Sequence, residues 1–311
     1  MVKLSTSLVL CRTPFQALLL KAVLVEENVT DYHLVYLTQD DSEEDHYYYN
    51  KLSENASQAY YLYQHKKKFD IFNHIEIYRK VFFMNIAPEY HKIFISSISS
   101  LALRKVASHY KEAEIISFDD GSGHINKHTL IAGRRPAIRM RVYEKLFRVP
   151  TVEKFKCKIH RHYSVYPHLD HIMPRDIIRY VNPFGSLKLL RSKAAGPTFF
   201  IGQPYPANYP VDKLMVFLRE QKIDYYVKHP REAQPLVPDI PLLKKNGKIA
   251  EEAIFKTSKG KIPRIIGGFS SVLFNIPHDQ AKKIMLVIKD DVTAKYYSEL
   301  AIQAGCKVVF F

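Results

Sequence analysis

Two adjacent carboxylates, Asp119 and Asp120, follow the apolar run 115–118, whose β-branched composition predicts a strand. Gly121 comes directly after them, and a glycine lets another molecule approach the backbone closely. A carboxylate at the C-terminal tip of a parallel strand could be the general base that removes a proton from a substrate hydroxyl. An Asx-turn that only shapes the following loop would give the same pattern. Position alone leaves both interpretations open.

His229 is the second candidate for chemistry. It lies between Lys228 and Pro230 after the apolar run 224–227, with Arg231 one residue further on. An imidazole between two permanent cations could meet an anionic leaving group and protonate it. A histidine held in a turn by the proline is the alternative, and for this motif alone it is the simpler explanation.

A third group of polar residues follows the glycine-containing run 264–268. Ser270 and Ser271 come at the start of a predicted helix, where hydroxyls, backbone N–H groups and the positive end of the helix dipole suit a phosphate. A serine that only caps the helix would look the same.

Three further residues could contact a nucleotide. Gly202 and Gln203 follow the predicted strand that begins at Thr198, where bare backbone could touch a ligand. Glu251, near the start of a predicted helix, could accept hydrogen bonds from ribose hydroxyls. A carboxylate that only offsets the helix dipole is the commoner explanation of such a position.

These candidates need elements that bring them together, and apolar runs alternate with helical stretches along most of the chain. In the first part we expect strands at 7–11, 33–37, 92–95 and 115–118, and helices at 15–26, 44–63 and 99–110. In the second part we expect strands at 198–202, 224–227, 264–268, 284–288 and 307–311, and helices at 211–221, 249–257 and 292–304.

This alternation predicts an α/β fold with two Rossmann-like domains whose parallel sheets face a central cleft. We expect a first domain at 1–132, a basic linker or helical insert at 133–195 and a second domain at 196–311. Ligands of such folds bind at the carboxyl ends of the strands. The sequence contains neither GxGxxG nor GxxxxGK[ST], which argues against the common dinucleotide and P-loop sites.

The net charge of +15 is concentrated in one segment. Residues 133–195 contain 15 Lys or Arg against 4 Asp or Glu. Ile138, Val142, Leu146 and Val149 recur there at helical spacing among arginines, which predicts a basic amphipathic helix that contacts an anionic membrane. An inter-domain or dimer helix is an equally good explanation. Nucleic acid is disfavoured, because no RRM, KH or helix-turn-helix signature is present.

The sequence also bears on location, cysteine chemistry and metals. No apolar run approaches the length of a spanning helix, and the first segment reads as a strand, so we expect a cytoplasmic protein. Its three cysteines, odd in number and far apart, indicate reduced thiols. His124 and His128 near the two aspartates permit a metal site, but their spacing matches no established one. The prolines around His160, His162, His168 and His171 likewise argue against a preformed metal site.

The motifs FDDGSGH, YVKHPRE and GGFSSVLFN, with the opening LCRTPFQ, resemble glycosyltransferase family 52, the bacterial lipooligosaccharide sialyltransferases. The resemblance covers nearly the whole chain. His229 follows Asp120 by 109 positions, and Ser270 follows His229 by 41.

The resemblance implies a GT-B fold, with the acceptor side in the domain at 1–132 and nucleotide-sugar binding in the domain at 196–311. It also implies transfer of sialic acid from CMP-sialic acid to a terminal sugar hydroxyl of a lipooligosaccharide, and galactose is the first candidate for that sugar. By this likeness Asp120, with Asp119 beside it, is the base. His229 assists the departing phosphate, which Ser270 and Ser271 hold. The other residues that the likeness or their strand-end position assigns are Gly202, Gln203, Lys228, Pro230 and Glu251 for the nucleotide, and Thr13, Pro14, Gln16 and Gly121 for the acceptor side.

One position departs from the family pattern. Where relatives carry an acid after the Gly-x-Pro stretch, this chain has Tyr205. Either Asp120 alone deprotonates the acceptor, or the chain uses another donor, such as a glucosyl nucleotide, or another acceptor. Because no DxD motif is present, we expect catalysis without a metal or other cofactor. The likeness also implies a peripheral protein at the inner face of the bacterial inner membrane, and it makes a homodimer plausible.

Overall fold

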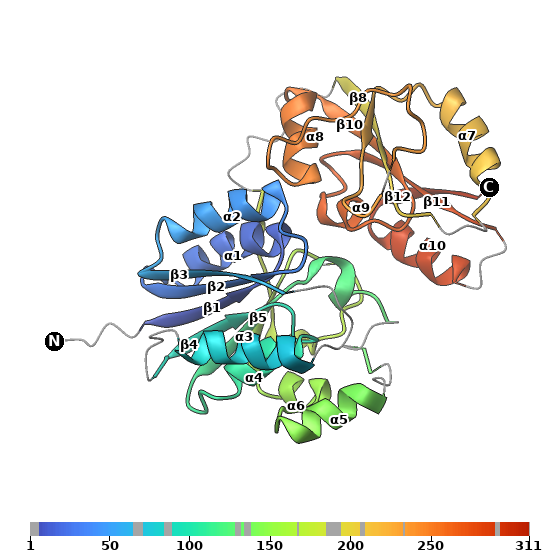
Figure 1. Cartoon of the computed structure of the whole chain (residues 1–311). Coiled ribbons are helices and arrows are strands. Elements are labelled where there is room, and N and C mark those ends of the chain that lie inside the picture. The colour runs from blue at the N-terminus through green and yellow to red at the C-terminus, as the bar shows by residue number, and fades with distance from the viewer. Residues whose placement is uncertain are drawn as a thin grey trace. The chain divides into compact units, whose positions relative to one another are not determined.

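The computed structural model describes residues 6–64, 71–83, 89–127, 132–133, 138–166, 168–184, 194–205, 209–232, 234–289 and 293–310. The chain divides into two compact units, Met1–Pro183 (unit 1) and Phe184–Phe311 (unit 2). Each unit is built around its own parallel sheet with helices on it (Figure 1). The predicted α/β class with two Rossmann-like domains is therefore confirmed.

The sheet of unit 1 has seven strands, all paired in parallel, in the order β3-β2-β1-β4-β5-β6-β7. Because the order reverses between β1 and β4, their carboxyl ends form the switch point at which such sheets bind ligands. The strands are β1 (Ser7–Cys11), β2 (Tyr32–Thr38), β3 (Gln58–Tyr63), β4 (Lys92–Ile95), β5 (Glu114–Phe118), β6 (Ile159–Ser164) and β7 (Ile178–Tyr180).

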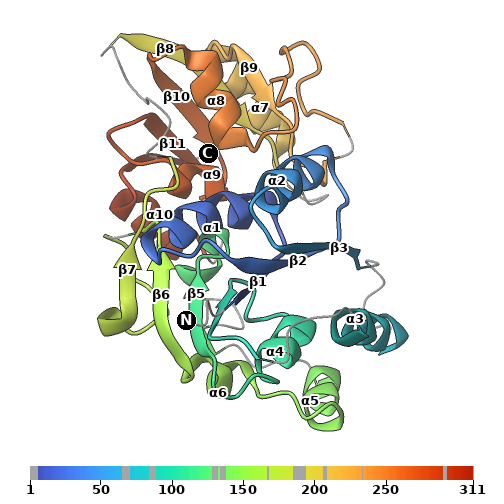
Figure 2. The ribbon, with the colours of Figure 1, turned by 90° about the vertical axis from the view of Figure 1, so that its left-hand side faces the viewer.

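Helices cover both faces of this sheet (Figures 1 and 2). Helices α1 and α2 pack together on one face, while apolar side chains of α3, α4 and α6 join the core on the other face. The helices are α1 (Pro14–Glu26), α2 (Glu43–Ser53), α3 (Ile71–Phe83), α4 (Leu101–Ala107), α5 (Ile138–Leu146) and α6 (Val152–Lys156), with short 3₁₀ helices at Gly121–His124 and Arg175–Ile177. With both faces covered, β1 and β2 are buried along their whole length.

Side-chain caps fix where the first two helices begin. The Thr13 hydroxyl accepts from the backbone N–H of Gln16, and Pro14 occupies the first turn, where its missing N–H costs nothing. Ser42 and Asp45 cap each other's backbone N–H at the start of α2. The loop after β1 is thereby held in a defined conformation.

The helix predicted at 44–63 is wrong in its second half. Helix α2 ends at Ser53, and residues 58–63 form β3, which pairs with β2 over its full length. The run Gln58–Tyr63 is rich in tyrosine, and aromatic side chains fit a pleated surface better than a helix. The prediction also missed α3, α6, β6 and β7, whereas the helix expected to start at Ser270 and Ser271 is present as α9 (Ser271–Asn275).

The segment 133–195 belongs largely to unit 1. Strands β6 and β7 extend its sheet, with Ile159, Tyr163 and Ser164 buried, so the boundary lies after Pro183 instead of at 132 and 195. Burial of Ile159 and of the consecutive His162, Tyr163 and Ser164 is the physical reason, because β6 needs cover on both of its faces. Residues 134–137, 167 and 185–193 of this segment, and His128 before it, lie outside the described residues.

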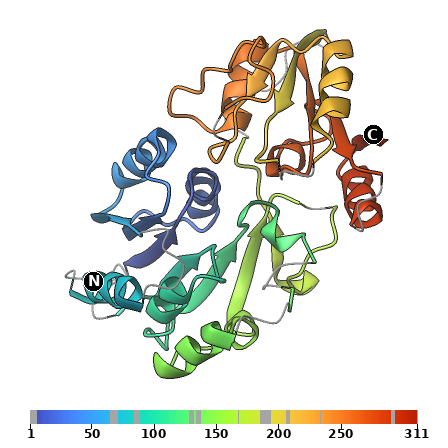
Figure 3. The same cartoon turned by 45° about the vertical axis from the view of Figure 1, so that its right-hand side comes forward.

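Unit 2 has a five-stranded parallel sheet in the order β12-β11-β10-β8-β9. Helices α7 and α8 lie on opposite faces of it (Figure 3). The strands are β8 (Ala195–Ile201), β9 (Tyr225–Val227), β10 (Ile262–Gly267), β11 (Lys282–Val287) and β12 (Cys306–Phe310), and the helices are α7 (Val211–Glu220), α8 (Ala250–Ser258), α9 (Ser271–Asn275) and α10 (Ala294–Gln303).

Within the described ranges, no helix combines the length and the apolar character needed to cross a membrane. Cys11 and Cys306 are buried, Cys157 is exposed, and all three are free thiols.

Candidate active site

Asp120 follows β5 directly, next to the switch point of the unit 1 sheet. Gln16 in the first turn of α1 and Ser97 just after β4 reach it from neighbouring segments. The Gln16 amide donates to Oδ1 of Asp120, and the Ser97 hydroxyl donates to Oδ2 at 3.1 Å. Both carboxylate oxygens are thus oriented by neutral donors, while the side chain keeps partial exposure.

Gln16 is itself held rigidly. It is fully buried, its carbonyl accepts from the backbone N–H of Arg12 at 2.8 Å, and its amide also contacts the Ser97 hydroxyl at 2.9 Å. Two segments far from Asp120 in the sequence, the start of α1 and the loop after β4, therefore fix its orientation. The positive charge of Arg12 adds an electrostatic interaction with Asp120, although burial lowers the pKa of the Arg12 guanidinium.

Asp119 lies in a different environment from its neighbour. It is fully buried, and Oδ1 accepts from His162 Nε2 at 3.0 Å and from His171 Nε2 at 3.1 Å. Oδ2 accepts from the Ser164 hydroxyl and from the Val165 backbone N–H, both at 2.8 Å. Burial alone would raise the pKa of Asp119, but the hydrogen bonds from the two histidines lower it far below its ordinary range.

Whether this cluster could bind a metal depends on which nitrogen of each histidine ring carries the proton. Asp119, His162 and His171 place three ligand-type atoms within 4.8 Å of one another. However, Nδ1 of His171 accepts a backbone N–H from Met173 at 3.0 Å, so neutral His171 carries its proton on Nε2, the atom that faces Asp119. A protonated nitrogen has no lone pair for a metal. The described geometry therefore fits a hydrogen-bonded cluster better than a metal site.

His124 connects this cluster to Asp120. Its Nδ1 accepts from the Asp120 backbone N–H at 3.1 Å, its ring lies against those of His162 and His171, and it is fully buried. Nε2 of His124 has no hydrogen-bond partner in the described part of the chain. Burial is the main cause that lowers the pKa of His124, followed by the nearby His162, so the ring is neutral at neutral pH.

The remaining predicted residues of unit 1 shape this site's backbone. Thr13 caps α1 and Pro14 begins it, which positions Gln16. Gly121 has φ +53°, a left-handed conformation that favours glycine directly after the two aspartates.

Ser97, His162, Ser164 and His171 were not predicted as site residues. Ser97 follows a predicted strand, so inspection of every strand end could have found it. The histidines had been considered only as metal ligands, and their role as donors to Asp119 depends on β6 joining β5, which the sequence did not reveal.

In unit 2 the predicted nucleotide residues follow β8, β9 and β10, which are adjacent in the sheet. A Cβ at Gly202 would meet Glu232 and come within 2.8 Å of the Tyr226 hydroxyl, so only glycine fits there. A Cβ at Gly268 would come within 2.9 Å of the Gln203 amide. The structure thus brings Gly202, Gln203 and the loop before Ser270 to one end of this sheet.

His229 is positioned by a short turn of backbone. Its N–H donates to Glu232 Oε2 at 3.1 Å, and its Nδ1 accepts from the Arg231 N–H at 3.0 Å. Neutral His229 therefore carries its proton on Nε2, from which it can be donated. Glu232 is buried and also accepts from the Tyr226 hydroxyl. Lys228 and Pro230, on either side of His229, are half-buried and exposed respectively.

Ser270 caps α9, its hydroxyl accepting weakly from the Val272 N–H at 3.4 Å, and Ser271 is half-buried beside it. Glu251 is 4% exposed and accepts from the Asn275 amide at 2.7 Å, so it links α8 to α9. Burial raises the pKa of Glu251. The structure thus shows a capping role for Ser270 and a linking role for Glu251, and their contacts with a nucleotide stay a prediction.

Tyr205, at the position where the family pattern has an acid, is a weak base candidate. Burial strongly raises the pKa of its phenol, so the group stays neutral and protonated. Asp120, by contrast, lies just after β5 and retains partial exposure, so its carboxylate is the stronger base candidate.

Two Rossmann-like units with polar residues at the strand ends define an α/β protein with a fold of the GT-B type. The sequence profile of glycosyltransferase family 52 matches residues 30–291. The chain belongs to glycosyltransferase family 52 and is a transferase.

Curated relatives carry related names. The chain is 24% identical over 321 residues to a CMP-N-acetylneuraminate:beta-galactoside alpha-2,3-sialyltransferase of Pasteurella multocida, covering 97% of this chain and 98% of that one. It is 26% identical to an N-acetyllactosaminide alpha-2,3-sialyltransferase of Haemophilus influenzae, covering 87% and 88%. A Neisseria meningitidis enzyme of the same name is 22% identical over 74% of this chain, which spans 64% of that protein's length.

Solved structures share the fold at low sequence identity. An alpha/beta-galactoside alpha-2,3-sialyltransferase of Photobacterium phosphoreum has a TM-score of 0.56 at 13% identity, covering 97% of this chain and 98% of that one. A UDP-GlcNAc 2-epimerase of Neisseria meningitidis has a TM-score of 0.58 at 9% identity, covering 98% and 87%. Both likenesses support the fold class.

Proposed function

We propose that this protein transfers sialic acid from CMP-sialic acid to a terminal galactoside hydroxyl of lipooligosaccharide, with inversion at the anomeric carbon. The observation that carries the proposal is the oriented, partly exposed Asp120 carboxylate, held by Gln16 and Ser97 at the switch point of unit 1. The names of the three curated relatives support the sialyl donor and the galactoside acceptor.

Asp120 is the general base in this proposal. It takes the proton from the acceptor hydroxyl as the oxygen attacks the anomeric carbon of the donor. Asp119 acts as a positioning residue, because four donors already occupy its buried carboxylate. The Gln16 amide and the Ser97 hydroxyl hold both oxygens of Asp120 in one orientation for this step.

The leaving group is CMP, whose phosphate gains negative charge as the glycosidic bond breaks. His229, protonated on Nε2, donates a hydrogen bond or a proton to that phosphate, and Ser270 and Ser271 bind its oxygens. Gly202, Gln203, Lys228, Pro230 and Glu251 contribute to nucleotide binding. Thr13, Pro14 and Gly121 shape the acceptor side.

We propose that the reaction needs no metal or other cofactor. The absence of a DxD motif and the tautomer of His171, which turns a proton toward Asp119, support this view. Initial rates should therefore survive treatment with EDTA. A strict requirement for added Mn²⁺ or Mg²⁺ would overturn this part of the proposal.

Asp120→Ala and Asp120→Asn test the base. We expect both to lower kcat for transfer from CMP-sialic acid to a galactoside by about a thousandfold or more, in the range for loss of a general base. The dissociation constant for CMP, measured by calorimetry, should change less than twofold, because the nucleotide residues lie in unit 2. Asp170→Asn, an exposed carboxylate, is the matched control. Normal turnover in Asp120→Asn would remove Asp120 from the mechanism.

A donor screen separates sialyl transfer from the second candidate, transfer of glucose. CMP and CMP-sialic acid should raise the melting temperature, whereas UDP and UDP-glucose should not. Selective stabilisation by UDP-sugars would replace the sialyl donor with a hexosyl one. Glucosyl transfer stays a candidate because this chain has Tyr205 where the family pattern has an acid.

We further propose that helix α5 holds the enzyme on an anionic membrane, at the inner face of the inner membrane. Ile138, Val142 and Leu146 are 82%, 55% and 63% exposed on this helix, spaced by four residues along one side. Arg141 and Lys145 flank them and are exposed too. An apolar stripe bordered by cations is typical of helices that lie in a lipid interface. A homodimer interface over the same stripe is the alternative.

Sedimentation with vesicles tests this proposal. Binding to vesicles with 30% phosphatidylglycerol should exceed binding to neutral vesicles and should fall with salt. Val142→Ser/Leu146→Ser should abolish it, while Val216→Ser, on the exposed side of α7, should not. Loss of a dimer in the double variant, with vesicle binding intact, would assign the stripe to self-association instead.

A further inference from the structure

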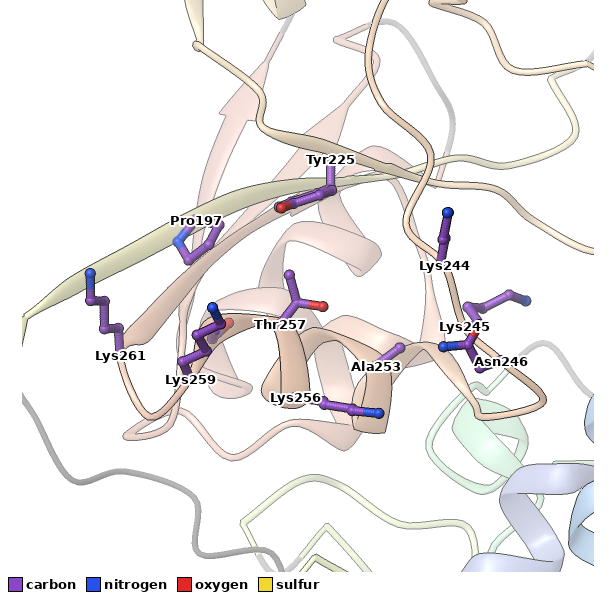
Figure 4. Close-up of a pocket in the computed structure, with 11 residues that line it drawn as sticks. Pro197, Tyr225, Lys244, Lys245, Asn246, Ala253, Lys256, Thr257, Lys259 and Lys261 are labelled. Atoms are coloured by element: carbon purple, nitrogen blue, oxygen red, sulfur yellow. The ribbon is translucent and has the colours of Figure 1, made fainter.

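We propose that unit 2 carries a second anion site that binds a ligand bearing more than one phosphate group. A cavity of about 510 Å³ is lined by five lysines and, among its described lining residues, by no carboxylate. Figure 4 shows Lys244 and Lys245 at one side of it, Lys259 and Lys261 at the other, and Tyr225 and Thr257 between them. The fifth lysine is Lys256.

Three separate segments build this lysine cavity. Lys244 and Lys245 lie in the loop after β9, Lys256 lies in the last turn of α8, and Lys259 and Lys261 lie in the connection from α8 to β10. Cations near a helix C-terminus offset its dipole, which accounts for Lys256 and Lys259. It does not account for the lysines that the other two segments bring to the same cavity.

The lysine cavity is distinct from the proposed nucleotide residues. Tyr225 is the first residue of β9 and Lys261 directly precedes β10, so the cavity lies at the amino ends of these strands. Gly202, Lys228 and Gly268 follow the carboxyl ends of β8, β9 and β10. A strand of seven residues such as β8 is about 20 Å long, which separates the two ends.

Four of these five lysines have no carboxylate close to their ammonium groups in the part of the chain that the structure describes. In the described ranges, none lies within 4 Å of the ammonium groups of Lys244, Lys256, Lys259 or Lys261. Residues 244–261 contain six lysines and two glutamates, and both glutamates are buried. Asp224 is the carboxylate among the described lining residues of the adjoining cavity, and it accepts from the Thr198 N–H at 2.7 Å.

These groups match the chemistry of phosphate esters. Each ammonium supplies three donors, and charge-assisted hydrogen bonds to phosphate are stronger than neutral ones. The Thr257 hydroxyl and the Asn246 amide add neutral donors between the cations. The volume lies in the usual range for a small ligand. Lysines lie at both sides of the cavity, so a ligand with two or more phosphates can pair with both sides at once. Such a ligand could be free in solution or part of a lipid headgroup.

Calorimetric titration of the full-length protein with tripolyphosphate tests the site, at about 0.15 M salt and with saturating CMP present. Lys256→Glu/Lys259→Glu should weaken binding at least tenfold, and Lys244→Gln/Lys261→Gln, which leaves the helix end unchanged, should weaken it several-fold. Lys282→Glu/Lys307→Glu, exposed lysines of the same unit with the same change in charge, should alter it less than twofold. Melting temperatures and CMP affinity verify that all variants are folded.

Vesicles with phosphatidylinositol 4,5-bisphosphate, whose headgroup carries two phosphate monoesters, form the second arm of the experiment. If the protein binds these vesicles and the lysine-cavity variants lose that binding, the natural ligand is a lipid headgroup. If the protein binds tripolyphosphate but not the vesicles, the natural ligand is soluble. The proposal would be overturned if the lysine-cavity variants and the control variant lost tripolyphosphate affinity equally, or if CMP displaced tripolyphosphate. Because tripolyphosphate binding is scored separately from CMP binding and transfer, failure of the proposed function leaves this test intact.

Discussion

Asp119 and Asp120 show how two adjacent carboxylates acquire different roles. Asp119 is buried under four donors, while Asp120 is partly exposed and held by two neutral side chains. A carboxylate whose lone pairs are all occupied is a poor proton acceptor, since protonation would break those bonds. The neighbours that strands β4, β5 and β6 provide therefore decide which aspartate is available as a base.

Gln16→Leu should show how much the orientation of Asp120 contributes. The variant removes the donor to Oδ1, and we expect kcat to fall about 10- to 100-fold, the range for misplacement of a catalytic group. KM for CMP-sialic acid should stay within twofold, because Gln16 lies in unit 1. Gln303→Leu, exposed on α10, is the control, and equal kinetics in the two variants would contradict the positioning role.

Because His124 and His162 are buried, we expect the free energy of unfolding to fall in acid. Burial lowers the pKa values of His124 and His162 below their ordinary 6.5. Between the folded and unfolded pKa values the unfolded chain binds more protons, so the free energy of unfolding rises with pH in that interval. Stability should therefore decline as the pH falls below about 6.5.

Urea unfolding between pH 5 and 7.5 measures this slope. His124→Gln removes one titrating ring and should flatten the decline, whereas His168→Gln, an exposed histidine, should leave it unchanged. An unchanged slope in His124→Gln would show that other groups dominate acid sensitivity.

At the scale of elements, the sequence predicted strands best where both faces are buried. The boundaries of β1 and β4 matched at every residue, because continuous apolar runs there have no competing interpretation. The tyrosines of β3 and the histidines and arginine of β6 look polar or helical in isolation, and only pairing with a neighbouring strand gives them their structure. The donors to Asp119 could not be predicted for the same reason.

The ion pair of Arg104 and Glu144 joins helices α4 and α5 inside unit 1. Arg104 is fully buried, donates to Glu144 at 2.6 Å and to the Ile98 carbonyl at 2.7 Å, and its Nε donates to the Pro150 carbonyl at 3.1 Å. Arg104→Met should lower the free energy of unfolding by about 3–5 kcal/mol, because it leaves a buried carboxylate unpaired.

A comparison with an exposed pair makes this test specific. Lys80→Met breaks the exposed pair with Glu76 on α3 and should cost less than about 0.5 kcal/mol. The double variant Arg104→Met/Glu144→Leu should recover part of the loss. A cost below about 1 kcal/mol for Arg104→Met, measured by urea unfolding, would contradict this account.

At the scale of the whole molecule, two units with separate cores divide the work. The core of unit 1 includes Leu8, Ile93 and Phe155, and that of unit 2 includes Phe200, Leu214 and Ile266. The proposed base, Asp120, lies in unit 1, and the proposed nucleotide residues lie in unit 2. Nucleotide binding should therefore depend on the stability of unit 2, and proton abstraction by Asp120 on the stability of unit 1.

Scanning calorimetry should accordingly resolve two unfolding transitions. CMP at a hundred times its dissociation constant stabilises the unit that binds it by about 2.7 kcal/mol, which raises one transition by roughly 10 °C. Arg104→Met should lower the other transition, which identifies it as unit 1. Ser270→Ala/Ser271→Ala should remove the response to CMP while both transitions persist. If CMP raised the transition that Arg104→Met lowers, the nucleotide would be bound by unit 1, and the division of roles between Asp120 and His229 would fail.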